Sequence, residues 1–135
     1  YDIMEYITIA NTGNTTDFGN LSGQARLGSA CSSNTRIVVH CAILGGSVVN
    51  TLEYITTANT GNSTNFGDLT AARYNTGSTS NHTLGIFIGG AGNDTNVIDK
   101  ITIASVGNAT DFGDLSAVGN RDLAATSSKH GGIAA

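Results

Sequence analysis

The residues that could do chemistry are few, and three histidines are the first of them. His40, His82 and His130 recur along the chain, each near the expected entrance to a strand. A catalytic triad would need a Ser or Cys nucleophile and a carboxylate at a recurring distance from such a histidine. The sequence offers no set of this kind. We therefore expect solvated or hydrogen-bonded loop histidines, no catalytic residues and no enzymatic activity.

A polar series of Asn and Asp residues is the second candidate. Its oxygen atoms could bind a hard cation such as calcium, but their spacing does not match a compact ligand loop. Asn and Asp next to glycine also stabilise turns by bonding the backbone. The series therefore predicts turns, with no metal and no cofactor. It comprises Asn14, Asp17 and Asn20, then Asn62, Asn65 and Asp68, then Asn108, Asp111 and Asp114.

The two cysteines, Cys31 and Cys41, lie ten residues apart. They could close a small disulfide across a hairpin, or they could be two ordinary buried thiols. Together with the nearby His40 they supply too few ligands for a metal site.

Composition indicates which elements must position these residues. Of the 135 residues 39% are hydrophobic and 12% charged, with 18 glycines and no proline. Thr, Ser, Asn, Gly, Ile and Val dominate, which is typical of short strands joined by tight turns. The net charge of −4 provides no basic surface for nucleic acid. No apolar run approaches the roughly 20 residues that span a bilayer.

One phrase occurs three times. Residues 101–116 read "ITIASVGNATDFGDLS", and residues 7–22 and 55–70 are close variants. Tyr6, Tyr54 and Lys100 are equivalent, which gives periods of 48 and 46 residues. This length suits one four-stranded propeller blade. We expect repeat 1 over about residues 6–53, repeat 2 over about 54–99, and repeat 3 over about 100–135, completed by 1–5.

Each unit contains the same order of signals. A small-residue strand is followed by an apolar strand that stops at a glycine pair, then by an alternating strand, and last by a short strand around Phe. The glycine pairs should allow tight turns and close approach. The Ile and Phe positions should face the core between units. These structural positions are Gly45, Gly46, Gly89, Gly90, Phe18, Phe66, Phe112, Ile7, Ile9, Ile55, Ile101 and Ile103.

The same order of elements resembles the kelch repeat. A glycine pair, an acidic residue beside an aromatic slot, an aromatic residue about a dozen positions later, Leu and Arg follow one another, with Phe where the kelch blade usually has Trp. The elements are Gly89, Gly90, Asp99, Lys100, Phe112, Leu115 and Arg121 in one unit, and Gly45, Gly46, Glu53, Tyr54, Phe66, Leu69 and Arg73 in another.

The wording of the phrase is also similar to repeats in virion fibre and appendage proteins of tailed bacteriophages, especially those of aquatic cyanobacteria. The two resemblances imply an all-β, kelch-like β-propeller with three blades' worth of sequence per chain. They further imply a non-enzymatic structural or binding protein, virion or extracellular, that recognises a host-surface glycan or another virion protein. The alternative is a secreted propeller enzyme or lectin, for example one similar to copper oxidases or active on glycans.

Three units are too few to close a propeller, which takes roughly four to eight blades. Residues 123–135 and 1–21 read as two parts of one split blade. Either two or three copies of the chain complete a ring by pairing these parts, or a longer chain supplies further blades.

Overall fold

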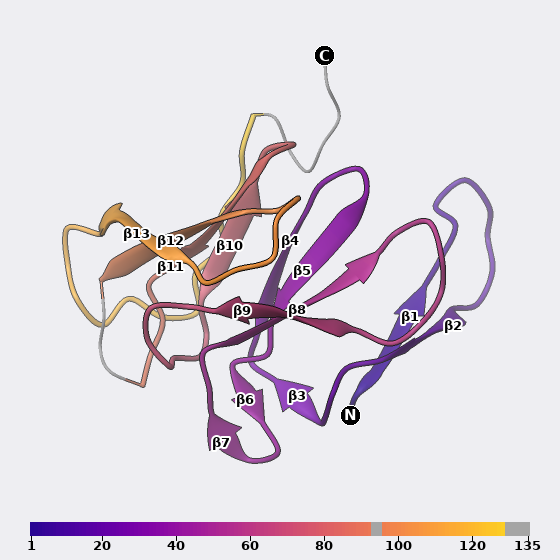
Figure 1. Ribbon diagram of the computed structural model, residues 1–135, viewed down its shortest axis with the longest axis horizontal. Helices are drawn as coiled ribbons and strands as arrows, with labels where there is room; N and C mark the ends of the chain where they lie inside the picture. The colour runs from indigo at the N-terminus through magenta and orange to yellow at the C-terminus, as the bar shows by residue number, and fades with distance from the viewer. Residues whose placement is uncertain (93–95, 129–135) are drawn as a thin grey trace.

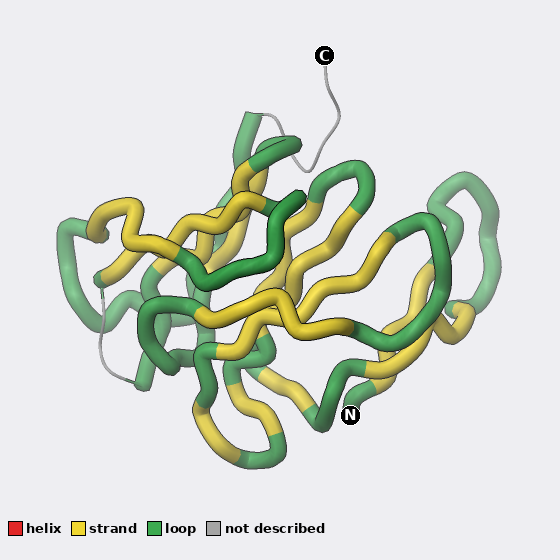
Figure 2. The backbone as a smooth tube through the Cα atoms, in the orientation of Figure 1, coloured by secondary structure: helices red, strands yellow, loops and turns green. Residues whose placement is uncertain are grey.

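The computed structural model describes residues 1–92 and 96–128, which fold into short β-strands without a helix. Segments rich in Thr, Ile and Val form the strands, and Gly and Asn occupy the connections between them (Figure 2). The strands are β1 (Ile3–Tyr6), β2 (Thr16–Asn20), β3 (Ala25–Arg26), β4 (Ser29–Ser32), β5 (Arg36–His40), β6 (Ile43–Leu44), β7 (Ser47–Val48), β8 (Thr51–Thr56), β9 (Thr64–Asp68), β10 (Gly77–Ser80), β11 (Leu84–Ile88), β12 (Val97–Thr102) and β13 (Thr110–Asp114).

These strands form four antiparallel sheets. The sheets are offset from the sequence periods given above, so from here on the sheet β4-β5-β8-β9 is called the middle repeat and the sheet β10-β11-β12-β13 the third repeat. The first repeat is the hairpin β1–β2, and β3-β6-β7 is a small separate sheet. The all-β prediction is confirmed, and two units contain the four strands that the sequence indicates. None of the four sheets closes into a barrel in the described part, and the three-bladed propeller stays a prediction. Residues 129–135 of the expected split blade, His130 included, lie outside the described residues.

The two four-stranded sheets lie next to each other, with β4 beside β10, while the β1–β2 hairpin stands at the other side of the middle repeat (Figure 1). Serine side chains link the first strands across this contact. Ser80 Oγ donates to the carbonyl of Ser32 over 2.8 Å, and Ser78 Oγ donates to that of Ala30 over 2.7 Å. Ser127 repeats the pattern by donating to the carbonyl of Ser80. The repeats are therefore joined through hydrogen bonds at their first strands.

The hydrophobic core lies between the middle and the third repeat. Apolar side chains from β5, β8, β9, β11 and β12 meet there, together with Ile103 and Ala109 from the loop that follows β12. Since each repeat is thin, its apolar face can be buried only by a neighbour. The core residues are Cys31, Val38, Leu52, Phe66, Leu69, Phe87, Ile101, Ile103 and Ala109.

The predicted core positions are buried only where a neighbouring repeat covers them. Ile55, Ile101, Ile103 and Phe66 are all buried, and Phe18 is half-buried. Three equivalent residues depart from the expectation: Ile7 is 59% exposed, Ile9 95% and Phe112 57%. They lie in the first repeat and on β13, at the two outer edges of the array, where no other repeat within the described residues packs against them.

The glycine pairs end β6 and β11 with left-handed backbone. Gly45, Gly46, Gly89 and Gly90 have φ of +58°, +94°, +53° and +113°. At Gly90 a Cβ atom would collide with the carbonyl oxygen of Tyr74. Glycine is therefore required there both for its φ and for the close approach of the preceding chain.

Candidate functional site

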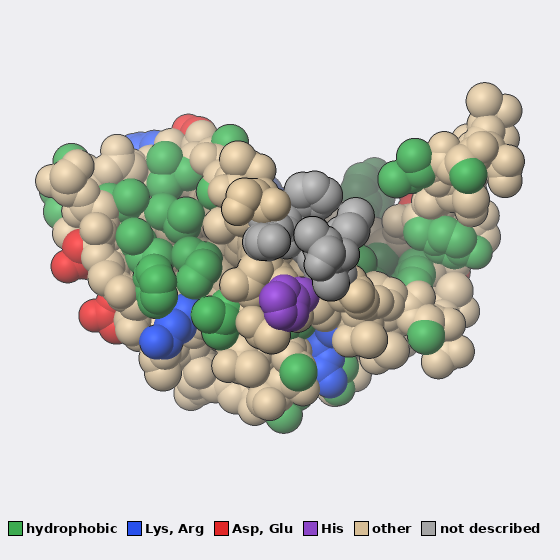
Figure 3. Space-filling view, turned by 90° about the horizontal axis from the view of Figure 1, so that it is seen from above, with side chains coloured by type: hydrophobic (Ala, Val, Ile, Leu, Met, Phe, Trp, Pro, Cys, Tyr) green, Lys and Arg blue, Asp and Glu red, His purple; other side chains and the backbone are tan. Residues whose placement is uncertain are grey.

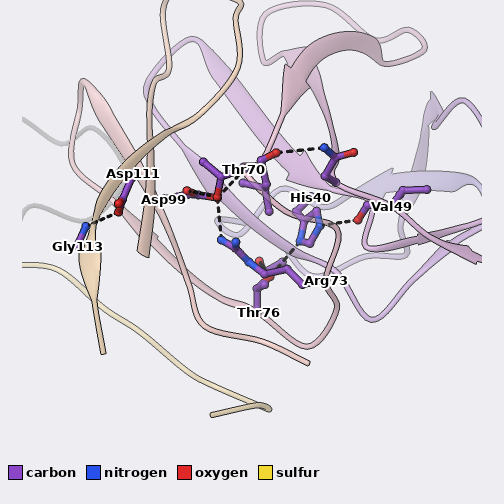
Figure 4. A network of polar contacts seen from close by, with 11 residues as sticks. His40, Val49, Thr70, Arg73, Thr76, Asp99, Asp111 and Gly113 are labelled. Carbon is purple, nitrogen blue, oxygen red and sulfur yellow. Dashed lines mark hydrogen bonds and ion pairs between the residues drawn. The ribbon is translucent and has the colours of Figure 1, made fainter. Parts of the chain in front are cut away.

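The acidic residue of the third repeat is the centre of a buried polar network (Figure 4). Asp99 on β12 accepts hydrogen bonds from the backbone N of Thr70, over 3.0 Å, and from its Oγ1, over 2.8 Å. Arg73 Nη2 lies 2.9 Å from Asp99 Oδ2, and both side chains are fully buried. Burial lowers the pKa of the Arg73 guanidinium, and the Asp99 carboxylate opposes this shift. Thr70 and Arg73 follow β9, so the network ties the middle repeat to the third.

Glu53 takes the same role one repeat earlier. It accepts hydrogen bonds from the backbone N of Ser22, over 3.1 Å, and from the hydroxyls of Ser22 and Ser63. Burial would raise the pKa of Glu53, but these hydrogen bonds outweigh it and hold the pKa below its usual value. A β-bulge precedes Glu53, as it does Asp99 and Glu5. Because a bulge re-aims the following side chain, it directs the Glu53 and Asp99 carboxylates toward the preceding repeat.

His40 is buried on β5, which differs from the solvated loop position that was one of the expectations. Its Nδ1 lies 3.1 Å from Thr76 Oγ1 and its Nε2 lies 3.4 Å from the carbonyl oxygen of Val49. Since a carbonyl only accepts, Nε2 carries the proton and Nδ1 accepts from the Thr76 hydroxyl. Burial lowers the pKa of His40 to about 4. The imidazole is therefore neutral at pH 7, enclosed and structural, whereas His82 is exposed.

The cysteines are free and buried, which decides between the two alternatives in favour of separate thiols. Burial raises the pKa of both Cys31 and Cys41 to about 12. Only a thiolate is a good nucleophile or metal ligand, so both side chains are chemically inert at neutral pH. In residues 1–92 and 96–128, no three His, Cys, Asp or Glu side chains gather closely enough to hold a metal ion.

A surface pocket is built by the loop that joins the third and fourth strands of the middle repeat. It has a volume of about 270 Å³ and combines hydroxyl and amide side chains with two aromatic rings. One ring, Tyr54, belongs to the same repeat, and the other, Phe18, comes from the preceding repeat. The lining residues are Phe18, Tyr54, Ile55, Thr56, Asn59, Thr60, Gly61, Asn62 and Thr64.

Equivalent pockets occur in the other two repeats. In the first repeat the pocket measures about 220 Å³ and keeps the aromatic ring in Tyr6 and the polar side chains in Asn11 and Thr12. In the third repeat it measures about 390 Å³, but Lys100 replaces the tyrosine and Val106 replaces the threonine. The repeated phrase thus builds one kind of pocket three times, and two of the three share nearly the same lining.

Two asparagines of the polar Asn and Asp series bond to a neighbouring repeat rather than within their own turns. Asn62 Oδ1 accepts from the backbone N of Asn20 over 3.0 Å, and Asn108 Oδ1 accepts from that of Asp68 over 3.1 Å. Among the described residues, Asp111 is the one member of the series that bonds within its own turn: its Oδ1 accepts from Gly113 N over 2.9 Å. Sequence reasoning missed the pockets, although the recurrence of Thr, Asn and Gly in this loop was a signal for them.

No protein-family model matches the sequence, and no curated protein resembles it significantly. The described residues form no helix that could cross a membrane.

Proposed function

We propose that the protein is a non-enzymatic binding module of a phage particle, and that its repeated pockets bind neutral glycans. The observation that carries the proposal is the recurrence of the pocket in three equivalent loops, of which the first and the middle are lined by uncharged donors and acceptors, while the third includes Lys100. A single pocket of this size could be incidental packing. A pocket that the sequence repeats with its phrase points to selection for the surface itself.

The lining of the middle pocket suits a sugar ring. Asn59 and Thr60 are exposed, and within the described part of the chain their side chains have no hydrogen-bond partner. Their amide and hydroxyl groups are free to bond the hydroxyls of a sugar, while the Tyr54 ring offers an apolar face to its C–H groups. Because the lining residues carry no charge, a neutral glycan fits better than a charged one.

Repetition of the pocket raises the affinity of the module for a repeating glycan. A shallow pocket binds weakly, but two equivalent pockets on one rigid array can engage a repeating polysaccharide together and raise the overall affinity. The first and middle pockets retain the Asn-Thr-Gly-Asn loop, whereas the third has Ser-Val-Gly-Asn. We therefore assign binding to the first and middle pockets.

The place on a virion rests on the resemblance of the repeated phrase to phage fibre and appendage repeats. Mass spectrometry of particles that carry the gene should find the protein among the virion components. Its absence from the particles would contradict this part of the proposal.

The binding test is titration of the purified chain against an array of neutral oligosaccharides. The combined variant Asn11→Ala, Thr12→Ala, Asn59→Ala and Thr60→Ala should lose at least tenfold in affinity for any oligosaccharide that binds, because the donors and acceptors of both pockets are gone. Ser105→Ala at the equivalent place in the third repeat is the matched control and should bind as the original chain does. Failure of the original chain to bind any neutral oligosaccharide would refute the assignment.

A further inference from the structure

We propose that the free edge of β13 binds the loop at residues 9–15 of a second copy of this chain, head to tail. This inference does not depend on glycan binding. It follows from the two junctions between repeats that the chain already contains, which repeat the same hydrogen bonds, while the matching halves at opposite ends have no partner among residues 1–92 and 96–128.

The junction between the first and the middle repeat defines the pattern. Gly61 N donates to the carbonyl of Phe18 over 2.7 Å, and Ser63 N donates to that of Asn20 over 2.9 Å. Asn62 Oδ1 accepts the Asn20 amide in return over 3.0 Å. The fourth strand of one repeat is thus bound by the loop of the next.

The junction between the middle and the third repeat reproduces it. Gly107 N donates to the carbonyl of Phe66 over 2.7 Å, and Ala109 N donates to that of Asp68 over 2.8 Å. Asn108 Oδ1 again accepts the amide of Asp68 over 3.1 Å. Two independent junctions with one set of bonds indicate that the pattern belongs to the repeat itself.

The carboxylate network strengthens each junction. The residue after the recurring leucine of one repeat, Ser22 or Thr70, donates through its backbone N and hydroxyl to the acidic residue of the next repeat, Glu53 or Asp99. A charge-assisted contact of this kind is stronger than a neutral hydrogen bond. Each junction therefore contains one acid and one hydroxyl residue as a matched pair.

At the tail of the array, which is the β13 edge of the third repeat, the acceptor half of this junction has no partner in the described part. β13 pairs with β12 in the register of β9 with β8, bulge included, so Phe112 O and both backbone groups of Asp114 face outward. Phe112 is 57% exposed, whereas its equivalent Phe66 is 2% exposed. A Cβ on Gly67 would overlap the Gly107 carbonyl, but a Cβ on Gly113 would meet no atom within 4 Å.

At the head of the array, which is the first repeat, the loop at residues 9–15 offers the donor half of the junction. Gly13, Asn14 and Thr15, the equivalents of the junction residues, are exposed and make none of the junction hydrogen bonds within the described residues. Glu5 is exposed, in contrast to the buried Glu53 and Asp99. The head thus presents a loop and a carboxylate of the kind that β2 and β9 already bind within the chain.

The apolar surfaces match as well. Ile9 is 95% exposed at the head, and its equivalent Ile103 is fully buried against the preceding repeat. Hydrophobic side chains gather over the β11–β13 sheet at one end of the molecule and on the β1–β2 hairpin at the other (Figure 3). Docking head to tail would bury both patches and would satisfy the open strand edge.

The geometry assigns specific bonds to this contact. Phe112 O would accept from the partner's Gly13 N, and Asp114 O from the partner's Thr15 N. The partner's Asn14 Oδ1 would accept from Asp114 N, as Asn62 and Asn108 do within the chain. Ser116 would donate to the partner's Glu5. The Phe112 ring would also border the partner's first pocket, as Phe18 borders the middle one.

A head-to-tail contact uses two different surfaces, so it forms closed rings or open filaments. Another protein with an exposed strand could reach the edge of β13, but the glycine–asparagine loop and the acid are features of this chain's own repeats. A second copy supplies all of them at once and is therefore the occupant that we propose.

Light scattering on the size-separated chain tests the contact. The original chain should have a mass that is a multiple of 13.7 kDa. Ile9→Asp at the head or Phe112→Asp at the tail should yield monomers, because each places a charge in the apolar contact. Val48→Asp, in an exposed hairpin that contributes no residue to the proposed contact, is the matched control and should associate like the original chain.

The decisive experiment mixes the two variants, each of which lacks one half of the contact. Ile9→Asp keeps a working tail and Phe112→Asp keeps a working head, so an equimolar mixture should form a one-to-one dimer that grows no further. Circular dichroism should show unchanged folds. If Phe112→Asp does not fold, Ser116→Glu replaces it at the tail, since Ser116 is exposed and would face the partner's Glu5. An original chain that stays monomeric up to its solubility limit, or a mixture that stays monomeric, would overturn the proposal.

Discussion

The acidic residue of the repeat offers a test with internal controls, because the same position has three different environments. Asp99→Ala, Glu53→Ala and Glu5→Ala remove it from the third, the middle and the first repeat. The three variants are best made in the Ile9→Asp background, so that the free energy of unfolding is measured without association.

The environments set the magnitudes. Asp99→Ala leaves the fully buried Arg73 without its counter-ion, and breaking a buried pair in this way costs about 3–5 kcal/mol. Arg73 Nε and Nη1 have no other hydrogen-bond partner in the described part of the chain, so nothing compensates. Glu53→Ala removes the charged acceptor of the Ser22 and Ser63 donors, which are exposed and half-buried respectively, but it strands no buried cation, so a smaller loss of about 1–3 kcal/mol is expected. Glu5 is exposed, and its loss should be within about 0.5 kcal/mol of neutral.

Urea unfolding followed by circular dichroism gives the three values. The expected order is Asp99→Ala most destabilised, Glu53→Ala intermediate and Glu5→Ala near the background. The double variant Asp99→Leu with Arg73→Met should recover much of the loss, since it removes both charges together. Equal losses at all three positions, or a double variant no better than Asp99→Ala, would refute the reasoning from burial and pairing.

Two further predictions concern burial. Phe66→Ala should cost about 3–5 kcal/mol because Phe66 is 2% exposed, whereas Phe112→Ala should cost less than about 1 kcal/mol in the monomeric background; comparable losses in thermal unfolding would contradict the edge position of β13. The folded pKa of His40 is about 4, below its value of 6.5 in the unfolded chain, so the unfolded state takes up the proton first. Stability should therefore be full above pH 6.5 and fall by about 3 kcal/mol as the pH drops toward 4. His40→Gln should remove most of the slope between pH 6.5 and 4.5, and an unchanged slope would place its origin elsewhere.

Local features of the chain were predictable from the sequence because short-range chemistry sets them. The alternation around Ile55 and Ile101 indicates strands, and β8 and β12 form there. The glycine pairs at Gly45 and Gly89 indicate sharp turns, and the backbone is left-handed at both. The order of four strands in a unit follows from the order of these signals along the chain.

Long-range environments were not predictable in the same way. Phe66 and Phe112 occupy equivalent positions in two copies of the repeated sequence. One is buried and the other is exposed, because burial depends on whether another repeat packs against the strand. Asn62 reads as a turn residue, but its partner is Asn20, which lies 42 positions earlier. His40 reads as a loop residue, but contacts with Val49 and with Thr76 and Phe87 of the third repeat enclose it.

The residues of a repeat therefore determine the hydrogen bonds of a junction. The position of the repeat in the array determines which junctions form. A fourth strand with outward carbonyls and a loop with outward amides are each incomplete alone, since an unpaired edge is open to further pairing. In the middle repeat both halves are satisfied, and its phenylalanine, acid and asparagine are accordingly bound or buried. The first and third repeats contain the same residues with one half unsatisfied. The exposed side chains at the two ends are for this reason complementary to each other, and this complementarity, more than their hydrophobicity, is the basis of the proposal that a second copy binds them.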